Sequence, residues 1–359
     1  MARVEPADAQ AHVDIELLKD EQGGLMYETG ITTISFFKGD FKPAADALRT
    51  QFASVVDANP WLAGRLVEVR GGTCGGSGGT GLRHPAAPSA ADVDAMFTAT
   101  AAADAAAFKL TPSEPYPEIC SKMYRSNKVI VANGSTLVNQ SLPTTLLTVA
   151  ESAPGDFAVI FSISHATVDG HTYYDIFKML QPGAAVRALT SARVLSFSET
   201  MRDELNQRKE LEWADSPSAT CMFMCSMMFE KKAKCFAFHV DPERVSAAKS
   251  AAAESGQVAF VSTNDILTSA FFTECRTRIG MMGIDCRDRI KGIGSDLAGN
   301  YVSVLTMDPE TYGAPVSIRK MLLSPPYTTT TKPLPGCCDW LCGRDSGKTA
   351  MVTNWCDCA

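Results

Sequence analysis

Apolar residues recur along the first quarter of the chain in two different patterns. The run Ile31 to Phe37 is rich in β-branched and aromatic residues, which is typical of a strand. The stretch Ala44 to Val56 follows Asp40 and Pro43 and carries apolar residues at intervals of three and four. This spacing predicts an amphipathic helix that begins near Pro43. We therefore expect a strand followed directly by a helix.

The middle of the chain repeats this order with a hairpin in front. Two β-rich runs, Thr144 to Val149 and Phe157 to Ser164, are separated by a Ser-Ala-Pro-Gly-Asp segment that is typical of a hairpin turn. His171 to Leu180 has the spacing of a helix. Residues His165 to Gly170 therefore lie where a strand gives way to a helix, a position that favours chemistry.

The remaining elements alternate between strand and helix, and no repeat of solenoid period is present. Mixed strands and helices in both halves predict an α/β (α+β) protein in which mixed sheets are flanked by helices. In the first half we expect a glycine-rich loop over Gly71 to Gly81 and a helix over Ala90 to Phe108. A charged helical tract over Thr200 to Trp213 is expected to follow. In the second half we expect strands over Cys235 to Val240 and Val258 to Val261, helices over Pro242 to Ala252 and over Thr263 to Arg278 (capped by Thr263 or Asn264), and a buried strand over Lys348 to Trp355.

Composition and charge narrow the class of protein. The chain has 359 residues, of which 45% are hydrophobic, enough for two domain-sized cores. Its 33 basic and 40 acidic side chains give a net charge of −7, so the overall field does not favour nucleic acid or an anionic membrane. The longest apolar stretch, Cys221 to Phe229, falls short of the ~20 residues of a membrane span. Because the first twenty residues lack the pattern of a secretory signal, we expect a cytoplasmic protein. We also expect the protein to be a monomer.

The twelve cysteines predict neither a disulfide framework nor a metal site. Cys221, Cys235 and Cys275 lie in apolar runs, which favours reduced thiols. The C-terminal cysteines, beginning with Cys337 and Cys338, lack the paired C-x-x-C spacing of structural zinc sites. We therefore expect no metal.

The strongest chemical motif is His165-Ala-Thr-Val-Asp169-Gly170, an H-x-x-x-D-G sequence after an apolar strand. A neutral imidazole can accept a proton from a hydroxyl or an amine while that group attacks a carbonyl. Asp169 could then hold the local geometry. The motif alone is equally compatible with a core histidine and an aspartate that caps the following helix, so both interpretations stay open.

Other segments accompany this motif in a recognisable order. They are Leu48 to Leu66 with its Pro60-Trp-Leu-Ala-Gly-Arg-Leu turn, Phe236 to Lys249, Val261 to Arg278, Asp285-Cys-Arg287-Asp-Arg289, Gly299-Asn300-Tyr301 and Thr353-Asn354-Trp355. Together with the H-x-x-x-D-G motif, this order resembles the CoA-dependent acyltransferase superfamily, which includes chloramphenicol acetyltransferase, condensation domains and the plant-type BAHD acyltransferases. The resemblance is greatest to the BAHD type and covers roughly the whole chain.

The resemblance implies two chloramphenicol acetyltransferase-like domains. Residues 1–190 would form the N-terminal domain that carries the motif, residues 191–234 a crossover segment, and residues 235–359 the C-terminal domain. The BAHD pattern continues with a D-F-G-W-G segment after its T-S-W strand, whereas this chain stops at Ala359. We therefore expect a truncated second domain and an incomplete gene product.

The resemblance also assigns roles to residues. His165 would be the general base, and Asp169 would face away from the substrate and pair with Arg287. Thr353 and Trp355 would line the substrate and contact the tetrahedral oxyanion. From the residues alone, Arg287 could equally be an exposed cation, and Thr353 and Trp355 could belong to a surface strand with one packed tryptophan.

The function implied is transfer of an acyl group, other than an amino-acyl group, from acyl-CoA to a hydroxyl or amine of a small-molecule acceptor. Acyl-CoA is then a substrate, and we expect no bound cofactor, no metal and no nucleic-acid partner. A non-catalytic or regulatory binding protein that retains a truncated acyltransferase fold is the alternative.

Overall fold

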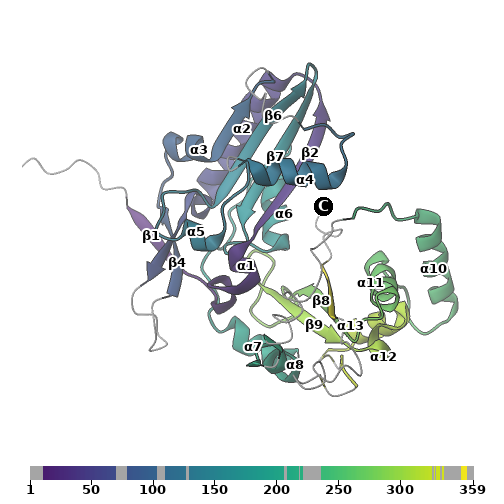
Figure 1. Cartoon of the computed structure of the whole chain (residues 1–359). Helices are drawn as coiled ribbons and strands as arrows, with labels where there is room; N and C mark the ends of the chain where they lie inside the picture. The colour runs from purple at the N-terminus through teal and green to yellow at the C-terminus, as the bar shows by residue number, and fades with distance from the viewer. Residues whose placement is uncertain are drawn as a thin grey trace, which may run out of the picture. The chain divides into compact units, whose positions relative to one another are not determined.

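The computed structural model describes residues 11–69, 79–102, 110–126, 129–205, 208–217, 219–220, 236–325, 327, 329–331, 334 and 349–353 (Figure 1). These residues divide into two compact units. Unit 1 comprises the described residues within Met1–Leu195 together with Gly294–Asn300, and unit 2 comprises those within Ser196–Ile293 and Tyr301–Asp357. A short segment from late in the chain therefore belongs to unit 1.

The elements follow one another in a mixed order. Unit 1 contains β1 (His12–Glu16), η1 (Lys19–Glu21), α1 (Gly24–Glu28), β2 (Gly30–Lys38), α2 (Phe41–Ala58), η2 (Pro60–Ala63), β3 (Arg65–Val69), β4 (Gly79–Pro85), α3 (Ala90–Met96), β5 (Phe97–Thr100), α4 (Tyr116–Arg125), α5 (Gly134–Leu137), β6 (Thr145–Ala153), β7 (Asp156–Ser164) and α6 (Gly170–Met179). Unit 2 contains α7 (Phe197–Glu204), α8 (Arg208–Ala214), α10 (Pro242–Glu254), α11 (Thr263–Glu274), β8 (Ile279–Asp285), β9 (Val302–Met307), α12 (Pro309–Tyr312), α13 (Pro315–Leu322) and β10 (Thr349–Val352).

The central sheet of unit 1 has the strand order β2-β7-β6-β5. The predicted hairpin is confirmed: β6 and β7 pair antiparallel, and Gly155 in the turn adopts a φ of +83°, which favours glycine. β2 pairs antiparallel with β7 along its whole length, and β5 pairs parallel with β6. The mixed sheet predicted from the sequence is therefore present.

Helices cover both faces of this sheet (Figure 1). On one face, the ring of Phe161 in β7 lies 5.2 Å from that of Tyr173 and 6.1 Å from that of Phe177, both in α6. On the other face, Ile160 packs in a cluster with Ile119 and Met123 of α4. Because successive strand residues point to opposite faces, burial on both sides explains why β7 is apolar at every position from Phe157 to Phe161.

Tyr173 joins α6 to the sheet through its phenol group. The hydroxyl donates to the carbonyl of Phe161 at 2.8 Å and accepts from the backbone N–H of Thr33 at 3.0 Å. The side chain is buried, and this burial raises the pKa of the Tyr173 phenol well above its ordinary value. α6 is thereby held against both β2 and β7.

A second sheet in unit 1 has the order β1-β4-β3. After β1, the chain buries Leu17 and Leu18 and enters the short helix η1, which ends at the fully buried Glu21. A buried carboxylate is costly unless it is paired and hydrogen-bonded.

Unit 2 is built on the sheet β10-β8-β9, in which β8 pairs antiparallel with β9 and parallel with β10. α11 begins with a capping box, because Ser262 accepts from the N–H of Asp265 and the Asp265 carboxylate accepts from the N–H of Ser262. Arg319 of α13 pairs with Asp265 at 2.6 Å. Phe272 of α11 is fully buried and packs against Tyr312.

In the first half of the chain, two predicted elements differ from the structure among the described residues. The alanine-rich helix ends at Met96, after which Phe97–Thr100 forms β5, because pairing with β6 outweighs local helix propensity. Residues 103–108 of the predicted helix lie outside the described residues. The predicted glycine loop is also shorter, since Gly79–Gly81 belong to β4. The rest of that loop, up to residue 78, lies outside the described residues.

In the second half of the chain, two predicted strands, one helix cap and the burial of one strand differ from the structure. Val258 to Val261 forms no strand, and residues 236–240 are exposed and also form none; neither run has a ladder partner. Ser262, not Thr263 or Asn264, caps α11. β10 is partly exposed along its length rather than buried. The helices that begin at Phe41, Gly170 and Pro242 confirm the corresponding predictions.

Candidate active site around His165

His165 directly follows β7, so the strand fixes where the histidine backbone lies. Its N–H donates to the carbonyl of Thr29 at 3.0 Å, and its carbonyl accepts from Nδ2 of Asn300 at 2.7 Å. The residue is partly buried, and its Nδ1 is buried without a hydrogen-bond partner. Hydrogen bonds therefore fix both the N–H and the carbonyl of His165, whereas Nδ1 of its ring forms no hydrogen bond.

The loop between β7 and α6 is ordered by short-range contacts. Thr167 donates to the carbonyl of Ser164 from both its N–H and its hydroxyl, at 3.0 and 2.9 Å. Asp169 is the N-cap of α6, and its Oδ1 accepts from the N–H of Thr172 at 2.9 Å. Asp169 is fully buried. The capping role left open by the sequence is thus present, because the fully buried carboxylate satisfies an N–H at the start of the helix.

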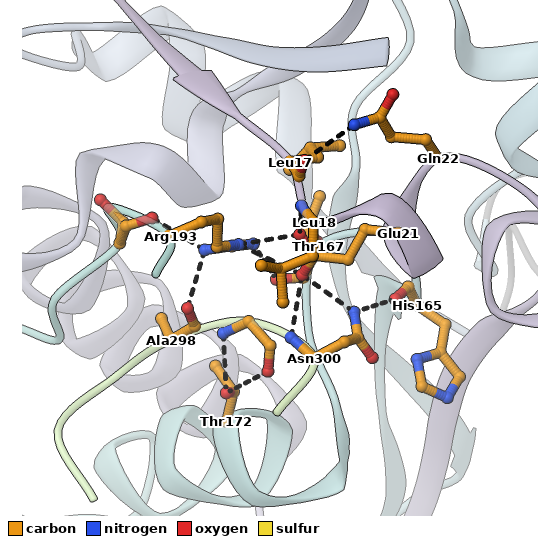
Figure 2. Close-up of polar contacts among 12 residues, drawn as sticks. Leu17, Leu18, Glu21, Gln22, His165, Thr167, Thr172, Arg193, Ala298 and Asn300 are labelled. Carbon is orange, nitrogen blue, oxygen red and sulfur yellow. Dashed lines mark hydrogen bonds and ion pairs between the residues drawn. The ribbon is translucent and has the colours of Figure 1, made fainter. Parts of the chain in front are cut away.

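A buried ion pair lies close to this loop (Figure 2). Nε of Arg193 is 2.9 Å from Oε2 of Glu21, and both side chains are completely buried. The guanidinium group also donates to the carbonyls of Ser191, Ala298 and Thr167, at 2.8, 2.8 and 2.9 Å. Donors at both ends of the guanidinium are therefore used, as a buried arginine requires.

Asn300 connects this ion pair to His165. Oε1 of Glu21 accepts from the backbone N–H of Asn300 at 2.9 Å and from its Nδ2 at 3.1 Å. The same Nδ2 donates to the carbonyl of His165. Gly299, which precedes Asn300, has a φ of +131°, and a Cβ there would lie 2.7 Å from Nε of Arg193. Glycine is required at this position for both reasons.

Sequence reasoning missed two members of this arrangement. Glu21 and Arg193 have no motif around them, and they are 172 residues apart along the chain. Asn300 belongs to the Gly299-Asn300-Tyr301 segment, whose sequence alone assigns it no role. This segment is the one sequence feature that points to Asn300, because a glycine followed by a polar residue suggests a place where the backbone approaches another part of the chain closely.

The other predicted site residues lie in unit 2 or outside the described residues. Arg287 is buried, donates to Oδ1 of Asp285 at 3.0 Å and lies 5.2 Å from the ring centre of Tyr301. It is therefore not an exposed cation. Thr353 follows β10 and is exposed. Trp355 lies outside the described residues.

Two further expectations concern metals and membranes. Within the described ranges, no group of three or more His, Cys, Asp or Glu side chains could hold a metal ion, and no helix is long and apolar enough to cross a membrane. Cys120 and Cys275 are free thiols. Cys221, Cys235 and the C-terminal cysteines from Cys337 onward lie outside the described residues.

Comparison with known proteins gives matches in structure. No protein-family model and no curated protein matches the chain. Among solved structures, TRI101 of F. graminearum with ethyl coenzyme A is 14% identical with a TM-score of 0.56, covering 97% of this chain and 85% of that one. TRI101 of F. sporotrichioides with coenzyme A and T-2 is 15% identical with a TM-score of 0.53, covering 96% and 83%.

A condensation domain is also similar. The first condensation domain of the calcium-dependent antibiotic synthetase, in complex with a substrate analogue, is 14% identical with a TM-score of 0.50, covering 88% of this chain and 76% of that one. The two TRI101 structures are complexes with ethyl coenzyme A and with coenzyme A and T-2. Identities this low establish the fold, and the resemblance seen in the sequence is confirmed at that level. The chain has the fold of TRI101 and of this condensation domain, which is the chloramphenicol acetyltransferase-like fold expected from the sequence.

Proposed function

We propose that this protein transfers an acyl group from acyl-CoA to a hydroxyl or amine of a small-molecule acceptor, with His165 as the general base. The observation that carries the proposal is the placement of His165. It sits at the end of a central strand, its backbone is held at both N–H and carbonyl, and it lies in a fold whose similar structures include TRI101 with coenzyme A. The proposed partners are an acyl donor and an acceptor, and the proposed compartment is the cytoplasm.

The proposed reaction needs one base and no covalent acyl-enzyme. His165 takes the proton of the acceptor hydroxyl or amine as its oxygen or nitrogen attacks the thioester carbonyl. The carbonyl oxygen carries negative charge in the tetrahedral intermediate, and Thr353 and Trp355 are the proposed donors to it. Collapse of the intermediate breaks the C–S bond, and protonated His165 returns its proton to the CoA thiolate. Holding both substrates beside one base supplies the remaining rate advantage.

Replacement of His165 tests this proposal. We expect His165→Ala to lower the rate of acyl transfer by about 10² to 10⁴, the range for loss of a general base, without changing the fold. The rate is measured as thiol release from a panel of acyl-CoAs with alcohol and amine acceptors. His239→Ala is the matched control, because His239 is exposed.

Three outcomes are distinguishable. Loss of thiol release in His165→Ala but not in the control supports general-base catalysis. Wild-type turnover in a folded His165→Ala protein contradicts it. Saturable binding of acyl-CoA without any turnover by the wild-type protein supports the alternative, a non-catalytic binding protein with an acyltransferase fold.

A further inference from the structure

The orientation of the Asn300 side chain follows from its neighbours. One end of its amide lies within hydrogen-bond distance of both the Glu21 carboxylate and the carbonyl of His165. Both groups accept hydrogen bonds and neither donates, so this end must be the NH₂ group. Oδ1 of Asn300 consequently points away from both. It is buried and has no hydrogen-bond partner.

The imidazole of His165 presents the complementary group. Its Nδ1 is likewise buried without a partner. The Asn300 amide is held at the backbone carbonyl of the same residue, and in the view of Figure 2 the ring nitrogen next to Cγ is on the side of the ring toward Asn300. Buried polar atoms without partners are rare in native proteins, and each one calls for an explanation. Oδ1 is an acceptor, and Nδ1 is a donor when it carries the ring proton, so one hydrogen bond between them would satisfy both atoms.

We propose that Asn300 is a positioning residue for His165, and that its Oδ1 accepts a hydrogen bond from Nδ1–H of the imidazole. The catalytic meaning of this contact rests on the function proposed above. With the proton fixed on Nδ1, the lone pair of the neutral ring lies on Nε2, which is then the atom that acts as the base. No hydrogen bond joins the two side chains in this structure, so one of them must turn to form it.

The ring of His165 is the part that moves. Asn300 is held by its backbone N–H and by both contacts of its Nδ2, whereas His165 Nδ1 has no partner. Rotation of a histidine side chain between low-energy rotamers breaks no hydrogen bond here. The buried guanidinium of Arg193 holds the Glu21 carboxylate, and Glu21 holds Asn300. Arg193, Glu21 and Asn300 thus form one chain of contacts that ends at His165.

The tautomer of His165 in the wild-type protein is the first test. The chain has five histidines, so long-range ¹H–¹⁵N spectra of histidine-labelled protein resolve a small set of rings, and His165→Gln identifies the signals of His165. We expect the neutral ring of His165 to carry its proton on Nδ1. A ring that carries the proton on Nε2 overturns the proposal. The measurement needs no acyl donor, so it separates this proposal from the proposed function.

Replacement of Asn300 is the second test. We expect Asn300→Ala to give a mixture of His165 tautomers and to lower kcat by about 10²-fold, with little change in KM for acyl-CoA, because the base is misplaced while binding is retained. Thr190→Val is the matched control: the Thr190 hydroxyl donates at 2.8 Å to Asp296, which lies in the same segment as Asn300, and the hydrogen bonds of Thr190 go to Asp296 and Ala298 rather than to Asn300 or His165.

These measurements show whether Asn300 positions the imidazole of His165 or only supports the local structure. An unchanged tautomer and an unchanged kcat in folded Asn300→Ala overturn the proposal. Equal losses of kcat in Asn300→Ala and Thr190→Val also overturn it, because they show only that the segment must be intact. If Asn300→Ala does not fold, the wild-type tautomer decides. If no acyl transfer is found in any protein, a tautomer shift in Asn300→Ala still supports the contact, and only the proposed function fails.

Discussion

Replacing Arg193 with alanine leaves the carboxylate of Glu21 buried without its guanidinium partner. Glu21 is fully buried, and Arg193 donates to both of its oxygens. The carboxylate keeps the N–H groups of Leu18 and Asn300. These are neutral donors, and they do not replace a positive charge.

The expected loss of stability can be worked from these contacts. Removing one member of a buried ion pair costs about 3–5 kcal/mol, because the other charge stays in a medium of low dielectric. Arg193 also donates to three backbone carbonyls, and each such hydrogen bond contributes roughly 1 kcal/mol. Water that enters the vacated space offsets part of this second contribution. We therefore expect Arg193→Ala to lower the free energy of unfolding by at least about 3 kcal/mol.

Urea unfolding followed by far-UV circular dichroism measures this loss as a fall in the midpoint at constant slope. Arg49→Ala is the control, because Arg49 pairs with Asp94 at the surface and its loss costs no more than about 1 kcal/mol. A second variant isolates the charge: Arg193→Ala with Glu21→Gln is expected to be more stable than Arg193→Ala alone, since no buried charge remains. The reasoning is refuted if Arg193→Ala costs less than about 1 kcal/mol or if Glu21→Gln worsens it.

Three further predictions concern the surroundings of the site. Tyr173→Phe removes the hydrogen bonds to Phe161 and Thr33 and is expected to cost about 1–3 kcal/mol in urea unfolding. Because burial raises the folded-state pKa of Tyr173, its contribution is fully present below the unfolded-state value of about 10 and is lost at higher pH, which alkaline unfolding of wild type and Tyr173→Phe will show. Gly299→Ala combines a left-handed φ with a close approach to Arg193 and is expected to cost about 1–3 kcal/mol, again by urea unfolding. The proposed pair of Asp169 with Arg287 predicts a coupling energy in a double-mutant cycle of the two alanine variants; strictly additive losses contradict it.

Local sequence patterns were sufficient to predict the strand before His165 and the helix after it. The hairpin of β6 and β7 follows from two β-rich runs around a Pro-Gly turn, and α6 follows from helical spacing after an aspartate cap. Backbone propensity, side-chain periodicity and capping each depend on residues a few positions apart, so they can be read along the chain. The ordered series of motifs around His165 also carried the fold class, which the solved structures confirm.

The environment of His165 was decided by tertiary structure alone. Asn300 comes from the second half of the sequence, yet the segment Gly294–Asn300 belongs to unit 1, and its contact with Glu21 joins residues 279 positions apart. The same holds for β5, whose alanine-rich neighbourhood predicts helix until β6 supplies a pairing partner. Burial, charge pairing and ladder hydrogen bonds arise only when distant segments meet, because their free energy depends on what surrounds a residue rather than on its neighbours in sequence.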